Sequence, residues 1–206
     1  MKSKNYVQKI VRVSMFVAII LILSMTPLGY IPLPFMKATT IHVPVIIGAC
    51  LFGPYIGGFL GGIFGITSVI QATISPTITS FVFTPFYNLN EQFYGGFSSL
   101  IVAIVPRVLI GLISGFVFIF FKNLINKESI SWFIAGIIGS ITNTIGVMSL
   151  IYILFGEQYA LATNIVPELL IGFILSIVVT NGIPEAIIAA ILTTTIGKTI
   201  KLLFYK

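Results

Sequence analysis

Long apolar stretches separated by short polar intervals make up most of the sequence. A helix needs roughly 20 consecutive apolar residues to cross a bilayer, and most of these stretches are about that long. The last stretch is too long for one perpendicular crossing at about 1.5 Å per residue, so Asn181–Pro184 is expected to kink or break it. The pattern predicts an all-α polytopic membrane protein, a bundle of six transmembrane helices in a single domain, 1–206. The predicted helices cover residues 6–29, 43–51, 54–71, 97–121, 132–155 and 165–203.

Three polar intervals fall on one side of the membrane by the parity of these helices, and we expect that side to be the outer one. The longest, Ala72–Gly96, is rich in Ser, Thr, Asn and aromatic residues, and its apolar content favours a functional loop. Its middle, Ile78–Asn88, fits a short strand or a re-entrant segment. The other two are LGYIPLP, Leu28–Pro34, continuing to Ile41, and GEQYALATN, Gly156–Asn164. Together they predict a polar mouth.

Glycines recur every four residues in the third predicted helix, at Gly53, Gly57, Gly61 and Gly65. In a helix this spacing puts them on one face, where a neighbouring backbone can approach closely. The tetrapeptide LFGP, Leu51–Pro54, predicts a tight turn before this helix because proline is well suited to the first helical position. The glycine stripe is therefore predicted to be a helix-packing seam without chemistry of its own.

Composition agrees with a membrane protein. The chain is 57% hydrophobic and 8% charged, whereas about a quarter of the residues in soluble proteins are charged. Six helices and their loops use up the 206 residues, so no room remains for a soluble catalytic domain.

The basic residues define the predicted orientation. Nine of the eleven fall at helix ends on the side that carries both termini, which predicts that both termini are cytoplasmic. Because they are spread along the chain and form no patch, the net charge of +6 does not indicate nucleic-acid binding. The exceptions are Lys37, expected outside, and Arg107, within the fourth helix. The nine are Lys2, Lys4, Lys9, Arg12, Lys122, Lys127, Lys198, Lys201 and Lys206.

Arg107 is the first candidate for chemistry, because it follows Pro106 about eleven residues into a membrane helix. A cation at that depth costs several kcal/mol unless it is paired, so its presence indicates a function. It could bind the anionic group of a substrate, or it could be paired structurally, with Glu168, Glu185 or backbone carbonyls. A position facing a partner or the cytoplasm is the third alternative.

Other polar side chains are expected to face the outer mouth. His42 begins the second helix and is either a ligand contact or a helix-end hydrogen-bond partner. Asn143 and Asn181 lie within helices, where interhelical hydrogen bonds worth roughly 0.6–2 kcal/mol compete with ligand contact as the interpretation. Aromatic residues of the long loop suggest either a lid over an apolar pocket or insertion into the membrane interface. The candidate binding residues are His42, Gln71, Thr79, Phe83, Tyr87, Asn88, Arg107, Asn143 and Asn181.

No catalytic set emerges from the sequence. The chain contains no aspartate, one histidine and one cysteine, and HExxH, a phosphate-binding loop and a CxxC pair are all absent. An ATPase activity of its own is excluded, and a metal site is not expected. A binding protein without enzymatic activity or cofactor is the simpler interpretation.

Ser14 and Ala18 form a pair of small residues four positions apart on the first helix. By itself such a pair more often serves intramolecular packing. Together with six short helices and a series of motifs, however, it resembles the substrate-binding (S) subunits of energy-coupling factor (ECF) vitamin transporters, most of all the pantothenate type. The resemblance covers nearly the whole chain. The motifs, in this order, are ATTIHVPVIIGACLFGP, SPTITSFVFTPF, VPRVLIG and NGIPEAI.

The resemblance implies a multi-pass protein of the prokaryotic cell membrane that binds one vitamin near the outer face, under lids formed after helices 1 and 3. It also implies docking on a transmembrane coupling (T) subunit driven by two ATPase subunits, which hydrolyse the ATP. The family docks through an Ala-xxx-Ala pattern on helix 1, so Ser14 and Ala18 are the docking residues it implies here.

Pantothenate fits the predicted site, because its carboxylate, hydroxyls and amide match a buried cation with hydroxyl and amide side chains. The only tryptophan, Trp132, is interpreted as an anchor at the cytoplasmic interface, which leaves none to stack on a flavin or pterin. Riboflavin, hydroxymethylpyrimidine or thiamine, and folate stay open as alternative substrates. A stand-alone secondary transporter is the alternative mechanism, and an intramembrane lipid-modifying enzyme is disfavoured by the missing acidic and nucleophilic residues.

Overall fold

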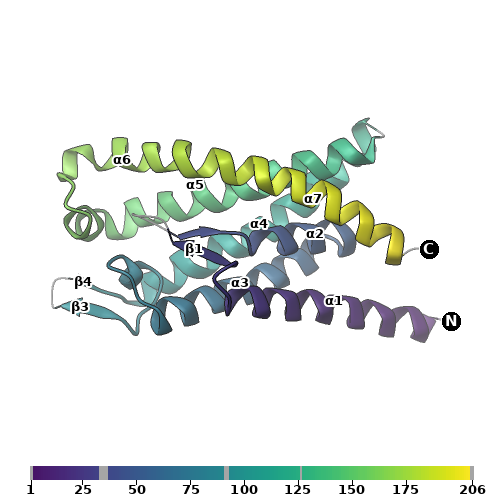
Figure 1. The fold of residues 1–206 in the computed structure, drawn as a ribbon, viewed down its shortest axis with the longest axis horizontal. Coiled ribbons are helices and arrows are strands. Elements are labelled where there is room, and N and C mark those ends of the chain that lie inside the picture. Colours follow the sequence, from purple (N-terminus) through teal and green to yellow (C-terminus); the bar gives the residue numbers. More distant parts are fainter. Residues whose placement is uncertain (1, 33–36, 91–92, 126, 205–206) are drawn as a thin grey trace.

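The computed structural model describes residues 2–32, 37–90, 93–125 and 127–204. The helices run roughly along one long axis, and the start of the first helix and the end of the last lie at the same end of the bundle (Figure 1). The sequence predicts that both ends lie together, because six membrane crossings return the chain to the side on which it started. Lys206 and positions 33–34 of LGYIPLP lie outside the described residues.

The elements follow the sequence in the predicted order, with two small hairpins between helices. The strands pair antiparallel as β1 with β2 and as β3 with β4. The elements are α1 (Lys2–Ser24), β1 (Tyr30–Pro32), β2 (Lys37–Thr39), α2 (His42–Phe52), α3 (Pro54–Ile74), the 3₁₀ turn η1 (Ser80–Val82), β3 (Asn88–Asn90), β4 (Phe93–Tyr94), α4 (Phe97–Ile125), α5 (Glu128–Ala162), the 3₁₀ turn η2 (Pro167–Leu169), α6 (Leu170–Ile177), the π-helical turn η3 (Val178–Gly182) and α7 (Ile183–Phe204).

Five helices are long and apolar enough to cross a membrane: α1, α3, α4, α5 and the continuous run Pro167–Phe204. The sixth, α2, has only 11 residues. At about 1.5 Å per residue it reaches roughly half of the ~30 Å hydrocarbon thickness. Residues 42–49 of α2 are all buried, and the helix contacts α1, α3, α4, α5 and α7. The fold is therefore an all-α polytopic bundle built around one short internal helix.

The two interruptions of helices predicted from the sequence are found at the predicted positions, but neither ends its helix. The break expected at Asn181–Pro184 is the π-helical turn η3, which lets the helix continue into α7. The helix expected to end near Phe155 has non-helical backbone angles there, yet α5 resumes and runs to Ala162. GEQYALATN is thus largely helical, because one distorted residue bends the helix without ending it.

The long interval after α3 contains local structure rather than an open loop. The 3₁₀ turn η1 is fully buried, and its Ser80 hydroxyl accepts a hydrogen bond of 2.8 Å from the Thr77 backbone N–H. The short strands come later than expected, at β3 and β4. This segment closes the end of the bundle that is remote from the termini (Figure 1).

The glycine stripe packs α3 against α4, as predicted. A Cβ atom at Gly61 would lie 2.0 Å from the backbone oxygen of Arg107, and one at Gly57 would lie 2.6 Å from that of Gly111. Gly53 does not belong to the seam. It forms the turn before α3, with φ 100° and open space around it, a backbone conformation that only glycine adopts readily.

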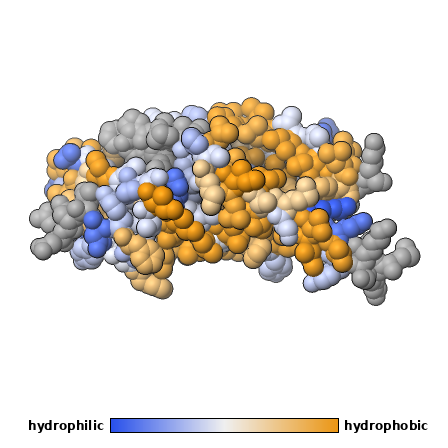
Figure 2. Space-filling model, turned by 60° about the horizontal axis from the view of Figure 1, so that its bottom comes forward, coloured by the Kyte–Doolittle hydropathy of each residue, from blue (hydrophilic) through white to orange (hydrophobic). Residues whose placement is uncertain are grey.

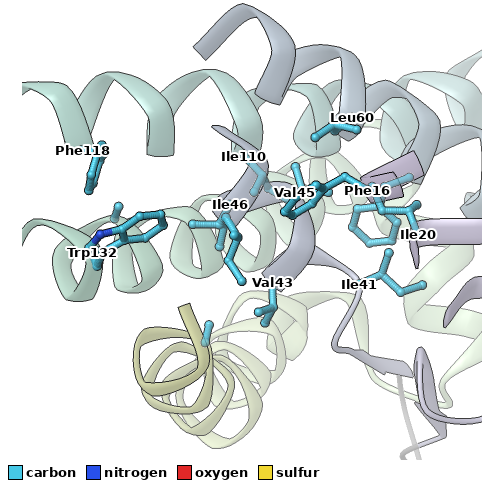
Figure 3. Packing of buried hydrophobic residues seen from close by; sticks show 14 of the residues in the cluster. Phe16, Ile20, Ile41, Val43, Val45, Ile46, Leu60, Ile110, Phe118 and Trp132 are labelled. Carbon is cyan, nitrogen blue, oxygen red and sulfur yellow. The ribbon is translucent and has the colours of Figure 1, made fainter. Parts of the chain in front are cut away.

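The apolar core near the termini corrects the interpretation of Trp132. Figure 3 shows Trp132 and Phe118 together, in a line of buried residues that continues through Ile46 to Phe16. The Trp132 side chain is fully buried, its ring centroid lies 4.7 Å from that of Phe118, and its ring also contacts Gly197 of α7. It is a core residue, because the neighbouring glycine leaves room for the indole inside the bundle.

The exposed surface of the long helices is apolar. On α7, Ile183, Ile187 and Ile191 form an outward stripe in which each side chain is more than half exposed. Figure 2 shows a broad hydrophobic region over the middle of one face, with the strongly hydrophilic residues mostly nearer the ends. Exposed apolar surface on this scale fits a lipid environment and not water.

Candidate functional site

A cavity lies in the half of the bundle remote from the termini. Its walls come from the end of α3, the segment around η1, the third turn of α4, the middle and end of α5, the first turn of α7, and the β1–β2 hairpin. It contains about 750 Å³ of empty space, including its opening to solvent. Its walls combine apolar side chains with hydroxyls, two amides, one cation and one carboxyl group. The lining residues are Tyr30, Thr39, Ser68, Gln71, Ala72, Thr77, Thr79, Ser80, Phe83, Arg107, Asn143, Thr144, Val147, Met148, Ile151, Tyr159 and Glu185.

Arg107 supplies the only cation among these lining residues, and only 4% of its surface is exposed. Its Nη1 donates to the Val102 backbone oxygen at 2.8 Å, while Nε has no hydrogen-bond partner in the described chain. The guanidinium carbon lies 5.5 Å from the ring centroid of Phe64 and 5.4 Å from that of Phe83. Two aromatic faces therefore hold the charge in place and leave donor capacity unused.

The predicted ion pair of Arg107 with Glu168 or Glu185 does not form. Within the described ranges the one ion pair at 4.0 Å or less joins Lys201 to Glu128, near the other end of the bundle. Glu168 is exposed on η2 and does not line the cavity, so it lies in the wrong place to pair with this arginine. Glu185 does line the cavity, without reaching the guanidinium. The cation consequently remains available on the cavity wall.

The β1–β2 hairpin is fastened to two helices through cavity residues. Tyr30 and Thr39 face each other in its register. The Tyr30 hydroxyl is 3.1 Å from the Ser68 hydroxyl on α3, and the Thr39 backbone N–H donates to Glu185 Oε1 on α7 at 2.9 Å. Burial raises the pKa of the Tyr30 phenol above its usual value of 10.0, so this hydroxyl stays neutral. Tyr30 and Thr39 thus link α3 on one side of the cavity to α7 on the other.

Five of the nine residues proposed from the sequence line this cavity. They come from α3, the segment before η1, the segment after it, α4 and α5, and are Gln71, Thr79, Phe83, Arg107 and Asn143. Asn143 is buried, and its Oδ1 has no hydrogen-bond partner within the described residues, so the interhelical bond expected of this oxygen is absent.

The other four proposed residues lie elsewhere. His42 is buried beside Thr39, with its Nδ1 3.4 Å from the Thr39 hydroxyl, behind the residues that line the cavity. Tyr87 packs against the apolar cluster near Phe81, and Asn88 is exposed and accepts a bond from the Gly95 N–H at 3.2 Å. Asn181 is half-buried in the π-helical turn, away from the lining residues.

The sequence reasoning missed several lining residues. Ser68 carried a usable signal, since it lies seven positions after Gly61 and three before Gln71, on one helical face. From the sequence, Glu185 is predicted only as a partner for Arg107. Tyr30 and Thr39 carried no local signal, because only the register of the hairpin brings them together. The missed residues are Tyr30, Thr39, Ser68, Thr77, Thr144, Tyr159 and Glu185.

Fold and cavity together define a multi-pass membrane protein with an internal cavity that combines apolar walls with hydroxyls, amides and one cation. The chain matches the family model "ECF transporter, substrate-specific component" over residues 8–197, and it belongs to this family of vitamin-transport proteins. It is 34% identical over 197 residues to the pantothenic acid transporter PanT of Lactococcus lactis subsp. cremoris, covering 94% of each chain. It is also 34% identical over 206 residues to the pantothenate transporter PanT of Leuconostoc mesenteroides subsp. mesenteroides, covering 95% of this chain and 93% of that protein.

Proposed function

We propose that this chain, as a single domain, is the pantothenate-capturing S subunit of an ECF importer in a prokaryotic cell membrane. It binds the vitamin from the outer face, with both of its own termini in the cytoplasm. It then delivers the vitamin by docking on a T subunit that two ATPase subunits drive. The chain itself catalyses no reaction and carries no cofactor.

The observation that carries the proposal is Arg107, a buried cation on the cavity wall with an unpaired Nε and no carboxylate within 4.0 Å in the described chain. A charge-assisted hydrogen bond to a carboxylate would use this donor. The hydroxyls of Ser68 and Thr79 and the amides of Gln71 and Asn143 offer partners for the hydroxyl and amide groups of pantothenate. The two related transporters named for this vitamin support the same substrate.

The docking face is supported by the exposure of α1. Ser14 and Ala18 are both exposed, and α1 is the least buried of the five long helices. A small-residue pair on an exposed helix allows close approach of a partner helix. Ser14→Leu with Ala18→Leu should therefore prevent co-purification with the T subunit and the ATPases while vitamin binding persists.

Calorimetry on the detergent-solubilised protein tests the substrate. We expect one pantothenate to bind per chain, whereas pantothenol, which has an alcohol in place of the carboxylate, should bind at least about tenfold more weakly. Tight binding of riboflavin, thiamine or folate with none of pantothenate would contradict the proposal. Uptake into vesicles that lack the T subunit and ATPases would instead support a secondary transporter.

A further inference from the structure

Glu185 is the one carboxyl group among the described residues that line the cavity, and it stands on the first turn of α7. Its Oε1 accepts the Thr39 backbone N–H at 2.9 Å. A carboxylate has about four lone-pair sites, so this bond, the one it accepts within the described residues, leaves capacity for donors from a ligand. Glu185 can therefore hold strand β2 and still accept hydrogen bonds from a ligand.

Arg107 and Glu185 line one cavity and influence each other electrostatically, but no ion pair at 4.0 Å or less joins them. The site is consequently dipolar. A carboxylate entering it is attracted by the guanidinium and repelled by the Glu185 carboxylate. Hydroxyl and amide N–H groups of a ligand instead favour the Glu185 side of the cavity, since they can donate hydrogen bonds to a carboxylate.

We infer that Glu185 is a specificity-determining residue, which accepts hydrogen bonds from the hydroxyl-bearing end of the ligand and excludes ligands that carry a negative charge there. This inference rests on the proposed function and adds the orientation of the vitamin. The carboxylate of pantothenate lies at Arg107, and its hydroxyls lie toward Glu185 and Thr39. A dianion of the same length meets like charge at Glu185.

Two analogues of pantothenate separate this role from a purely structural one. N-Succinyl-β-alanine keeps the amide and the carboxylate but places a second carboxylate where the hydroxyls were. N-Pivaloyl-β-alanine also keeps the amide and carboxylate and lacks both hydroxyls. If Glu185 served only to hold β2, its substitution would weaken all three ligands by the same factor.

The experiment measures the dissociation constants of the three ligands by calorimetry for the full chain, Glu185→Gln and Glu168→Gln. Glu168 is an exposed glutamate that does not line the cavity, so Glu168→Gln is the matched control and should change nothing. The wild-type protein should bind N-succinyl-β-alanine at least about 100-fold more weakly than pantothenate, and Glu185→Gln should reduce that difference at least about tenfold. The preference of Glu185→Gln for pantothenate over N-pivaloyl-β-alanine should fall about fivefold.

Unchanged ratios in Glu185→Gln, with all ligands weakened equally, would overturn the inference and leave the proposed function standing. Wild-type binding of N-succinyl-β-alanine within about tenfold of pantothenate would overturn it as well, whether or not the variant folds. A wild-type protein that binds no pantothenate would refute the proposed function and this inference together.

Discussion

The two halves of the bundle bury different polar groups. Near the termini, the Trp132 indole N–H donates to Glu128 Oε1 at 3.3 Å, and apolar side chains surround it. In the cavity half, Arg107 Nε and Asn143 Oδ1 are buried without partners in the described chain. An unpaired buried polar group costs about 1–3 kcal/mol. Ser140 and Thr193 are also buried without partners in the described chain, but they do not line the cavity, whereas Arg107 and Asn143 do and can be used by a ligand.

The seam between α3 and α4 gives the sharpest way to break this arrangement. Gly61→Ala should prevent recovery of folded protein, a loss above about 5 kcal/mol, because its Cβ would lie 2.0 Å from a backbone oxygen. Gly62→Ala is the matched control, since the nearest atom to its Cβ is a Val108 methyl at 3.8 Å. The measurement is the monodisperse yield and the thermal unfolding midpoint in detergent. Equal unfolding midpoints for the two variants would contradict the claim that the fold requires close packing of α3 against α4 at Gly61.

Trp132→Ala should lower the free energy of unfolding by about 3–5 kcal/mol, because it removes a fully buried aromatic side chain from the core near the termini. Pantothenate affinity, measured by calorimetry below the unfolding transition, should not change. An affinity loss of tenfold or more would mean that the two halves are coupled and not separable in the way described.

Arg107→Gln should have the opposite signature. Losing a charge-assisted hydrogen bond weakens pantothenate binding by about 1.5–3 kcal/mol, roughly 10- to 150-fold, while the unfolding midpoint stays the same or rises. Pantothenol affinity should change little, since it has no carboxylate to lose. Calorimetry with both ligands and a thermal melt of the same sample make the test. A variant that melts early yet binds both ligands normally would assign Arg107 to structure.

Asn143→Leu should give the smallest effects, in two directions. Removing an unpaired buried amide oxygen should raise the free energy of unfolding by about 1 kcal/mol, while one lost hydrogen bond weakens pantothenate by a similar amount. Thermal melts and calorimetry on one preparation measure both. A destabilised variant would show that Asn143 is a structural residue.

The sequence was most informative where the decisive property is local. Hydropathy located the helices, and the four-residue spacing of Gly57, Gly61 and Gly65 located the seam. It failed where the outcome depends on a distant partner. Trp132 was placed at an interface because nothing near it reveals Gly197, 65 positions later, which makes room for the ring. The cavity was foreseen only in part for the same reason, since Tyr30 reaches it through hairpin pairing.

Burial of α2 on every side has a consequence for biosynthesis. A helix of 11 residues is too short to be inserted by its own hydropathy, and Gly53 joins it tightly to α3, so the two enter the membrane as one hairpin. Its final position is bounded by α7, which leaves the ribosome after α1, α3, α4 and α5. The fold therefore cannot be completed helix by helix during translation. A nascent chain truncated before α7 would leave one side of α2 exposed to lipid. We expect such a chain to be degraded by quality-control proteases.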